Sequence, residues 1–352
     1  MLWLLLFISI SIVAMVTTLA IVGTKLYNYP KTNSDTKMRP FYPRNVIARG
    51  WSGGDPTASE QKYLDFHTEY LAKSEDMQHM LTASLVWVRA GSPNVFQKLG
   101  YKLIRTSDVD TFVHDILPKR TTPFTLITSD GDRSIPSELR DETVRTLLAS
   151  PLLKQWYTQN YDGTDPRIQP IPIGLCFHVA QNPQDPQIEF DRIRSLYAWN
   201  SDRKLRVWSD VHLGSYPLRF GNPRQKFKKT IPKLRFIDTI KARIKTTDLW
   251  KKYTEYAFVM SLPGNGVDCH RTWEALYLGA IVIVLPNALI PLYKGYRVEV
   301  VPEHEWESKL NDETWLLKTY QKHMENTPVF NETSREWLEK HSVEKHSVEK
   351  HD

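Results

Sequence analysis

Residues 256–286 read YAFVMSLPGNGVDCHRTWEALYLGAIVIVLP. The first part, 256–261, is a short apolar run with the length of a buried strand. It breaks at 262–266, a proline- and glycine-containing stretch that is typical of a loop. The chain therefore changes from a strand to a tight loop within about ten residues.

A helix and a second strand follow this loop. Residues 272–278 have helical character, and Gly279 stands where a C′ glycine closes a helix. Residues 280–285 are β-branched and apolar, which favours another buried strand, and Pro286 stops it. The whole segment predicts strand, glycine loop, helix and strand, and so an α/β fold with a parallel or mixed sheet.

The loop and the start of the helix form a candidate anion site. Gly264 and Gly266 can turn backbone N–H groups toward a ligand at positive φ, and a helix N-terminus adds a partial positive charge suited to a diphosphate. Arg271 lies in the first helical turn, where a cation is favourable if it faces an anion. Glu274, on about the same helix face, can accept hydrogen bonds from a ribose. A plain loop in which Glu274 pairs with Arg271 or Arg243 remains the alternative.

The composition limits the class of protein. The chain has 352 residues, of which 41% are hydrophobic, and a formal net charge of +6, so it can build a real core and suits an anionic partner. Two cysteines, Cys176 and Cys269, exclude a disulfide-dense scaffold and a cysteine-rich zinc site. One disulfide and two free thiols are both compatible with this count.

The N-terminus predicts a membrane anchor. Residues 2–23 contain no charged side chain, and about 20 apolar residues suffice to cross a bilayer. A basic start is missing and the apolar run is long, which favours a single-pass anchor over a cleaved signal peptide. Basic residues after the anchor favour a cytosolic domain, whereas the sequon at Asn331 allows an ER or Golgi lumenal one, so the orientation stays open.

The middle of the chain alternates short apolar runs with turns. We expect strands at 123–128 and 168–175, and helices at 141–148 and 152–157. The polar cluster 129–132 is typical of a turn. This alternation again favours an α/β fold.

Basic residues crowd between 203 and 245, where only Asp210 and Asp238 oppose them. The stretch fits either a solvated basic face or an electropositive rim beside a phosphate site. Few aromatic residues interleave with these cations and no nucleic-acid motif is present, so nucleic acid is not a predicted partner.

The segment 263–276 and the strand after it resemble the C-terminal signature of exostosin-like glycosyltransferases (glycosyltransferase family 47 type). The shared pattern is a glycine loop, an Asp, an Arg and Glu-Ala-Leu before a strand. The upstream stretches 123–132, 156–161 and 170–175 with His178 are also similar, so the likeness runs over about 122–293.

This resemblance implies a GT-B-like fold of two Rossmann-type lobes, compact because only about 270 residues remain between stem and tail. Together with the anchor, stem and tail that hydropathy and composition indicate, it divides the chain into five regions. These are a transmembrane signal anchor (1–24), a stem (25–58), an N-terminal acceptor-side lobe (59–200), a C-terminal nucleotide-sugar lobe (201–330) and a polar tail (331–352). The implied activity is transfer of a sugar from a nucleoside diphosphate sugar to a glycan or protein acceptor. No cofactor is required, although a divalent cation is compatible with such chemistry.

The resemblance also implies roles for single residues. The diphosphate is expected to meet Gly264, Asn265, Gly266 and Arg271, and the ribose Glu274, while Asp268 belongs to the shared pattern. Arg224 and Lys228, spaced i,i+4 in the basic stretch, are candidates for further phosphate contacts. No residue of the chain is assigned to a resident metal.

A catalytic base has to lie near the acceptor hydroxyl. Asp132 and His178 follow probable strands, where α/β sites form. Two other interpretations remain. Asp130 and Asp132 together match the Asp-x-Asp of metal-dependent GT-A enzymes. Alternatively, the chain is a membrane-anchored nucleotide-sugar-binding protein without turnover.

Overall fold

The computed structural model describes residues 81–82, 84–91, 107–175, 186–198, 202–213, 219–242 and 244–330. The predicted anchor, the stem, the polar tail, Cys176 and His178 lie outside these ranges. No helix in the described ranges combines the length and the apolar character needed to cross a membrane.

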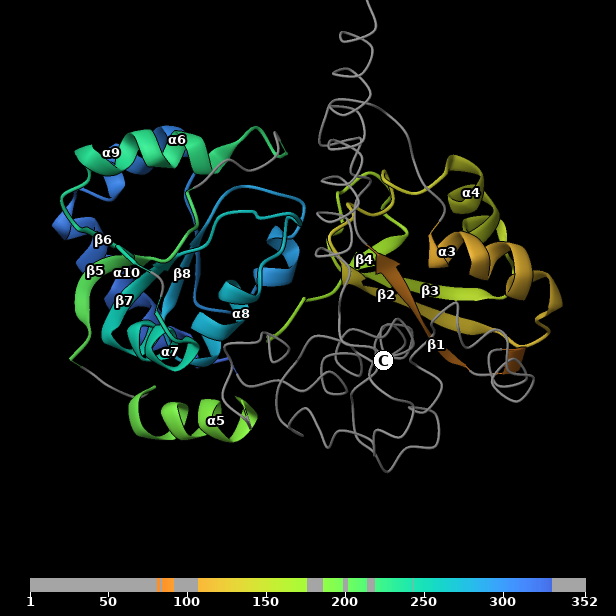
Figure 1. Ribbon diagram of the computed structural model, residues 1–352, viewed down its shortest axis with the longest axis horizontal. Helices are drawn as coiled ribbons and strands as arrows, with labels where there is room; N and C mark the ends of the chain where they lie inside the picture. Colours follow the sequence, from red (N-terminus) through yellow and green to blue (C-terminus); the bar gives the residue numbers. More distant parts are fainter. Residues whose placement is uncertain are drawn as a thin grey trace, which may run out of the picture. The chain divides into compact units, whose positions relative to one another are not determined.

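The C-terminal half is built on a five-stranded sheet (Figure 1). The strands are β5 (Lys204–Ser209), β6 (Ile237–Thr239), β7 (Tyr256–Met260), β8 (Ile281–Val284) and β9 (Val298–Val300). Their spatial order is β6-β5-β7-β8-β9, and every neighbouring pair is parallel. The strand order reverses direction between β5 and β7, which makes this point the topological switch of the sheet.

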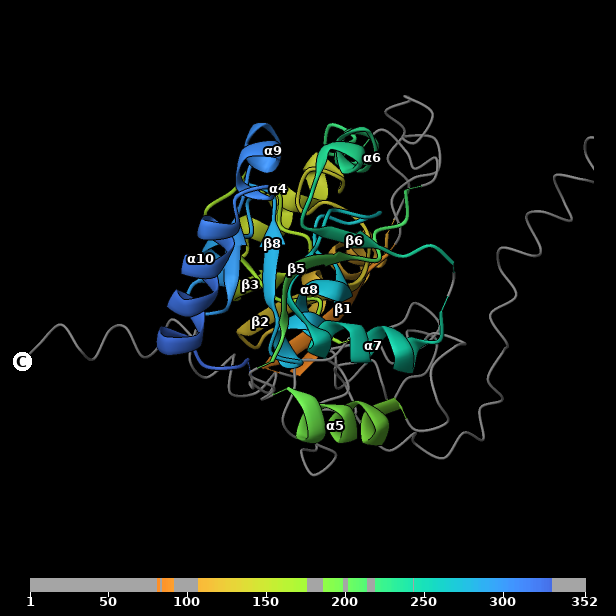
Figure 2. The same cartoon turned by 90° about the vertical axis from the view of Figure 1, so that its left-hand side faces the viewer.

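Apolar side chains on the two faces of this sheet form separate cores, because side chains alternate along a strand. Trp208 and Val259 face one core, while Val207 and Phe258 face the other. One face is covered by α5 (Pro186–Tyr197), α7 (Thr246–Glu255) and α8 (His270–Tyr277); the other is covered by α6 (Pro223–Thr230), α9 (Trp306–Lys309) and α10 (Glu313–Asn326) (Figure 2). In the described residues, this half also contains three short 3₁₀ turns, η7 (Ile231–Lys233), η8 (Ile290–Tyr293) and η9 (Glu303–Glu305), and the other half contains η6 (Leu117–Lys119).

The N-terminal half contains a four-stranded sheet whose order follows the chain. Its strands are β1 (Leu85–Gly91), β2 (Phe124–Gly131), β3 (Leu153–Thr158) and β4 (Ile168–Pro170), and all neighbours are parallel. The helical elements here are α3 (Asp108–Thr111), the π-helix η5 (Phe112–Ile116) and α4 (Asp141–Ala149). Buried Val86, Leu126 and Trp156 form its core together with Phe112.

The quoted segment folds as predicted. Strand β7, helix α8 and strand β8 occupy the expected positions to within two residues at each end. Gly279 has φ +86°, the left-handed conformation of a C′ glycine. The predicted α/β class is therefore confirmed, with two parallel sheets.

Three predictions upstream need correction. The predicted helix at 152–157 is wrong, because residues 153–158 form strand β3, which pairs with β2 and buries Trp156. Ser129 and Gly131 are not in a turn, since β2 continues through them in register with β1. The strand at 168–175 is confined to β4 (Ile168–Pro170). Strand β2 and helix α4 lie where they were expected.

Candidate functional site

The candidate site lies where β5 and β7 end, at the switch point of the five-stranded sheet. Open parallel sheets bind ligands outside the carboxyl ends of their strands at such a point. Asp210 follows β5 directly, and the glycine loop 262–266 follows β7 by two residues. Topology alone therefore brings Asp210, the loop and the start of α8 together.

Arg271 is held in this place by an ion pair with Asp210. Its Nε lies 2.7 Å from Asp210 Oδ1, and the two side chains are only 14% and 8% exposed. Tyr253 of α7, fully buried, hydrogen-bonds the same carboxylate. Burial alone would lower the pKa of Arg271, but the nearby negative charge of Asp210 outweighs it and raises that pKa, so the guanidinium stays charged.

Only part of the hydrogen-bonding capacity of the Arg271 guanidinium is used within the described part of the chain. Nε donates to Asp210, whereas neither Nη group donates to any residue in the described part of the chain. An arginine fork with unused N–H groups binds carboxylates and phosphates in a bidentate manner. The acid at the end of β5 thus orients Arg271 and leaves its anion-binding edge available.

Glu274 lies one helical turn after Arg271 and is buried. The pKa of Tyr253 is raised well above its usual value, first by the burial of the phenol and then by the nearby negative charges of Asp210 and Glu274. Arg271 pairs with Asp210. Arg243, the other expected partner of Glu274, lies outside the described residues.

The glycine loop is fixed by Arg224, at the start of α6. Arg224 is buried, and its guanidinium donates to the carbonyl oxygens of Pro263 at 2.7 Å and His212 at 3.3 Å. A Cβ at Gly264 would lie 3.0 Å from an Arg224 nitrogen, a tight contact that would require Arg224 to shift by a few tenths of an ångström. Arg224 therefore supports the backbone of the loop, while Lys228, one turn later, is exposed.

Neither Gly264 nor Gly266 has a positive φ, so the expected reason for the glycines is wrong. Gly266 is needed for close approach instead. A Cβ there would lie 2.6 Å from the side-chain amide of Asn160, which follows β3. The backbone N–H of Gly264 donates to the carbonyl of Gly266 at 2.9 Å, within the loop itself.

Asp268 joins the loop to the N-terminal half. Its buried carboxylate accepts hydrogen bonds from the backbone N–H of Ile173 and of Cys269 and from the indole of Trp273, at 2.7 to 3.0 Å. Its own N–H donates to Asn160 Oδ1 at 2.9 Å. The carboxylate thus has three protein donors around it.

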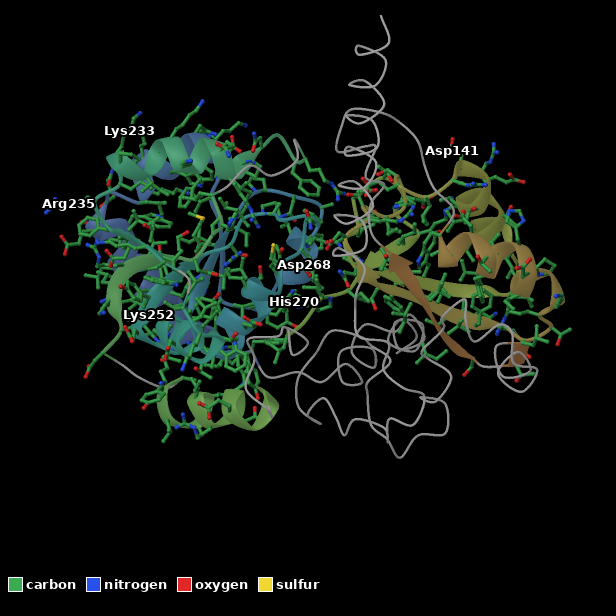
Figure 3. All side chains as sticks on the ribbon, viewed as in Figure 1. Asp141, Lys233, Arg235, Lys252, Asp268 and His270 are labelled. Carbon is green, nitrogen blue, oxygen red and sulfur yellow. The ribbon has the colours of Figure 1, made fainter. Side chains whose placement is uncertain are left out.

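The carboxyl edges of the two sheets meet in a set of contacts that we call the seam. It consists of the Asp268 contacts, a hydrogen bond of His270 and the contacts of Arg219. His270 Nδ1 and the carbonyl of Gly174 are joined by a hydrogen bond of 2.7 Å (Figure 3 labels Asp268 and His270). Arg219 donates to the carbonyl of Asp132 and forms an ion pair of 2.7 Å with Glu138. Residues that follow strands of both sheets therefore contact one another.

The structure brings some predicted residues together and places others elsewhere. Gly264, Asn265, Gly266, Asp268, Arg271 and Glu274 all lie on the loop or on α8. Asp132 is half-buried beside the seam. The side chain of Asp130 is not described, and no three His, Cys, Asp or Glu residues in the described ranges are arranged to hold a metal ion. Cys269 is a free thiol that donates to the carbonyl of Leu262.

The basic stretch 203–245 is neither a simple solvated face nor a continuous phosphate rim. Arg203 is buried and donates to four backbone carbonyls, and Arg206 pairs with Asp238 at 2.8 Å. Lys226 and Lys233 pair with Glu303 and Glu307. Most of these cations therefore have structural partners from distant segments.

Four residues of the site and seam were not predicted: Asp210, Tyr253, Asn160 and Arg219. Asp210 had a signal in the sequence, since it follows an apolar run and is one of only two acids in the basic stretch. Asn160 and Arg219 lie in stretches that were noted in the sequence, but their contacts could not be predicted, because these contacts join residues more than 80 positions apart.

Comparisons with known proteins give limited information. No protein family profile matches the chain, and no curated protein matches it. Among solved structures, the chain is similar to an alpha-glucosyltransferase in complex with UDP and a 13-mer DNA containing a HMU base. The two share 11% identity over 77% of this chain and 83% of the other, with a TM-score of 0.33. A TM-score of this size does not establish a common fold.

Proposed function

We propose that this protein is a glycosyltransferase that uses a nucleoside diphosphate sugar and holds the diphosphate at Arg271. The observation that carries the proposal is the orientation of Arg271 by Asp210 at the switch point of a parallel sheet, with both Nη groups unused by the described residues. The start of α8 adds its partial positive charge at the same place, and no side chain caps it. Anion binding is what this arrangement favours.

The resemblance to exostosin-like glycosyltransferases supports sugar transfer as the reaction. The pattern of glycine loop, Asp268, Arg271 and Glu274 maps onto one loop and one helix at this site. Two parallel sheets that meet at their carboxyl edges are compatible with the GT-B arrangement that the resemblance implies. Membership of that family remains part of the proposal, as does membrane attachment through residues 2–23.

In the proposed step, the acceptor hydroxyl oxygen forms a bond to the anomeric carbon while the bond from that carbon to the β-phosphate oxygen breaks. The hydroxyl proton passes to a base, and the nucleoside diphosphate leaves with both electrons of the broken bond. Arg271 stabilises the negative charge that develops on the leaving group. Asp132, beside the seam, and His178 remain the candidate bases.

The proposal is tested by donor binding and donor turnover. Full-length protein is titrated with UDP, GDP and their common sugar conjugates in a calorimeter, and sugar release is then followed with the donor that binds. Arg271→Ala should weaken binding at least tenfold, equivalent to about 1.4 kcal/mol, and abolish sugar release. Arg192→Ala is the matched control, because Arg192 also pairs with an acid at 2.7 Å but lies exposed on α5.

Four results would decide against the proposal or narrow it. No binding of any nucleoside diphosphate would contradict it, as would unchanged binding in Arg271→Ala. Tight binding without sugar release or transfer would instead identify a nucleotide-sugar-binding protein. Activity that requires manganese or magnesium and is lost in Asp130→Ala would favour the metal-dependent GT-A interpretation.

A further inference from the structure

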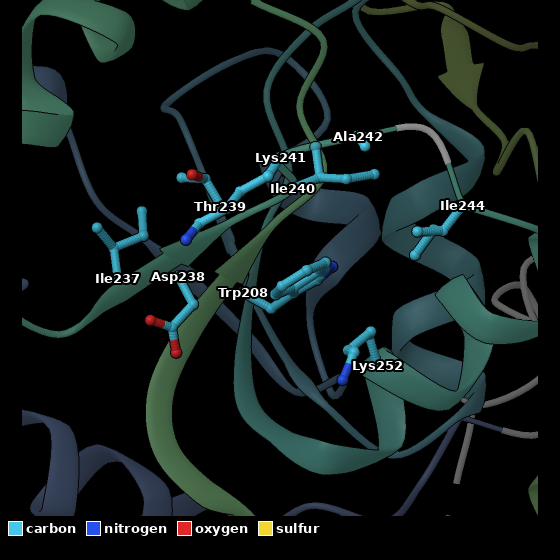
Figure 4. A pocket seen from close by; sticks show the side chains of 9 residues that line it. All are labelled: Trp208, Ile237, Asp238, Thr239, Ile240, Lys241, Ala242, Ile244 and Lys252. Carbon is cyan, nitrogen blue, oxygen red and sulfur yellow. The ribbon is translucent and has the colours of Figure 1, made fainter.

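A cavity of about 590 Å³ lies beside β5 and β6 (Figure 4). Its apolar lining includes Ile240, Ala242 and Ile244 from the segment after β6, and Trp208 from β5. The volume falls in the usual range for small-molecule pockets. The cavity opens at the carboxyl end of β6, where open parallel sheets place their ligands.

Trp208 is the unusual residue of this cavity. Its side chain is 93% buried, since only 7% is exposed, yet its indole Nε1 has no hydrogen-bond partner in the described part of the chain. A buried donor without a partner costs about 1–3 kcal/mol, and tryptophan N–H groups usually find one. Trp306 also has an indole nitrogen without a hydrogen-bond partner in the described part of the chain, but Trp306 does not line the cavity.

The polar groups of the cavity are mainly donors. The carboxylate of Asp238 is engaged by Arg206 through two hydrogen bonds, at 2.8 and 2.9 Å. Lys241 and Lys252 also line the cavity, and Lys252 Nζ lies 6.0 Å from the centre of the Trp208 ring while pairing with Glu255. A ligand that fits this set has flat apolar faces and hydrogen-bond acceptors on its edge. A heterocyclic base has both properties, whereas an alkyl chain lacks the acceptors.

Two segments of the chain contribute residues both to the cavity and to the anion site. Trp208 lies one residue before the end of β5, and Asp210 is the first residue after that strand. On α7, Lys252 borders the cavity and its neighbour Tyr253 hydrogen-bonds Asp210. The cavity lining and the residues that orient Arg271 therefore come in part from the same two segments of the chain, β5 with the residue after it and α7.

We propose that this cavity is the nucleobase subsite, in which the base of a nucleotide packs against Trp208 while its phosphates reach Arg271. The inference rests on the proposed function for the identity of the ligand as a nucleotide donor. It adds that recognition of the base depends on Trp208 and on the segment 240–242 after β6.

The test separates base recognition from phosphate recognition. Full-length protein is titrated calorimetrically with UMP, CMP, AMP and GMP, with ribose 5-phosphate and with inorganic pyrophosphate. At least one nucleotide should bind ten times more tightly than ribose 5-phosphate. Ala242→Trp, which fills the cavity from an exposed position, should remove this preference and leave pyrophosphate binding unchanged. Trp208→Phe, which retains a ring but loses the N–H, should reduce the preference in part.

Ala149→Trp is the matched control, because Ala149 is exposed at the end of α4 in the other half. This variant should bind every probe as the native protein does. Nucleotide preference that survives both Ala242→Trp and Trp208→Phe would overturn the inference, and so would equal binding of ribose 5-phosphate and all four nucleotides. Base-dependent binding without sugar transfer would refute the proposed function alone. Sugar transfer that is insensitive to Ala242→Trp would refute the subsite alone.

Discussion

At the residue scale, Asp268 is the most constrained group of the candidate site. Its carboxylate is 3% exposed and accepts hydrogen bonds from Ile173, Cys269 and Trp273. Burial raises the pKa of Asp268 to about 7, from a usual value of 3.8, although these three donors act in the opposite direction. A carboxyl group in this position titrates in the neutral range.

This shift predicts a pH dependence of stability. The folded state retains the Asp268 proton to a higher pH than the unfolded chain, so the stabilisation is complete below about pH 4 and is lost as the pH rises to about 7. Relative to Asp268→Asn, the free energy of unfolding of the native protein should fall across this window by on the order of 4 kcal/mol. Urea unfolding at a series of pH values measures it. If the free energy of unfolding changes with pH in the same way in the native protein and in Asp268→Asn, Asp268 is not responsible for the change.

At the element scale, the glycine loop and α8 act as one preorganised unit. Arg224 holds two loop carbonyls, Asp210 orients Arg271, and Asn160 occupies the space beside Gly266. The loop is therefore shaped by side chains from three other segments of the chain.

Replacement of Gly266 by alanine tests this packing. The added Cβ would lie 2.6 Å from the Asn160 amide, so Gly266→Ala should lower the free energy of unfolding by about 1–3 kcal/mol. The cost should shrink when Asn160→Ala has already removed the amide, which a double-mutant cycle measures. Gly295→Ala is the control, because its φ is +88° with no atom within 4 Å of a Cβ, so its cost should not depend on Asn160. Additive costs for Gly266 and Asn160 would contradict the packing argument.

The local order of elements in residues 256–286 was predictable from the sequence, because apolar runs, a glycine loop and a C′ glycine are all short-range signals. Strand β3 was not, since its pairing with β2 overrides a pattern that favoured a helix. Arg271 was identified from its place on the helix. Its orienting partner Asp210 and the support from Arg224 depend on contacts 61 and 39 residues away, which periodicity does not report.

At the scale of the whole molecule, the seam joins the two sheets through polar contacts. Arg219 is its principal charge, since it pairs with Glu138 and donates to Ser134 and to the carbonyl of Asp132. Both side chains of the pair are 13% exposed, so removal of one partner leaves the other charge largely buried.

Arg219→Met should therefore loosen the seam while both sheets remain folded. We expect faster backbone hydrogen exchange in residues 132–138 and a loss of about 2–4 kcal/mol in the free energy of unfolding, with unchanged far-UV circular dichroism. Arg167→Met is the control, because Arg167 makes a pair of 2.6 Å with Asp165 but is 62% exposed, and it should change stability by less than about 1 kcal/mol. Exchange rates at 132–138 equal to those of the native protein would contradict this role of Arg219.

The position of Asp268 has one more consequence. The same residue ends the glycine loop and holds the backbone of Ile173 in the opposite half. A ligand whose binding displaces Asp268 must alter the free energy of the Ile173 segment, and a ligand bound at that segment must alter nucleotide affinity by the same factor, because such coupling is reciprocal. Donor and acceptor would then bind cooperatively through a single aspartate, without touching each other.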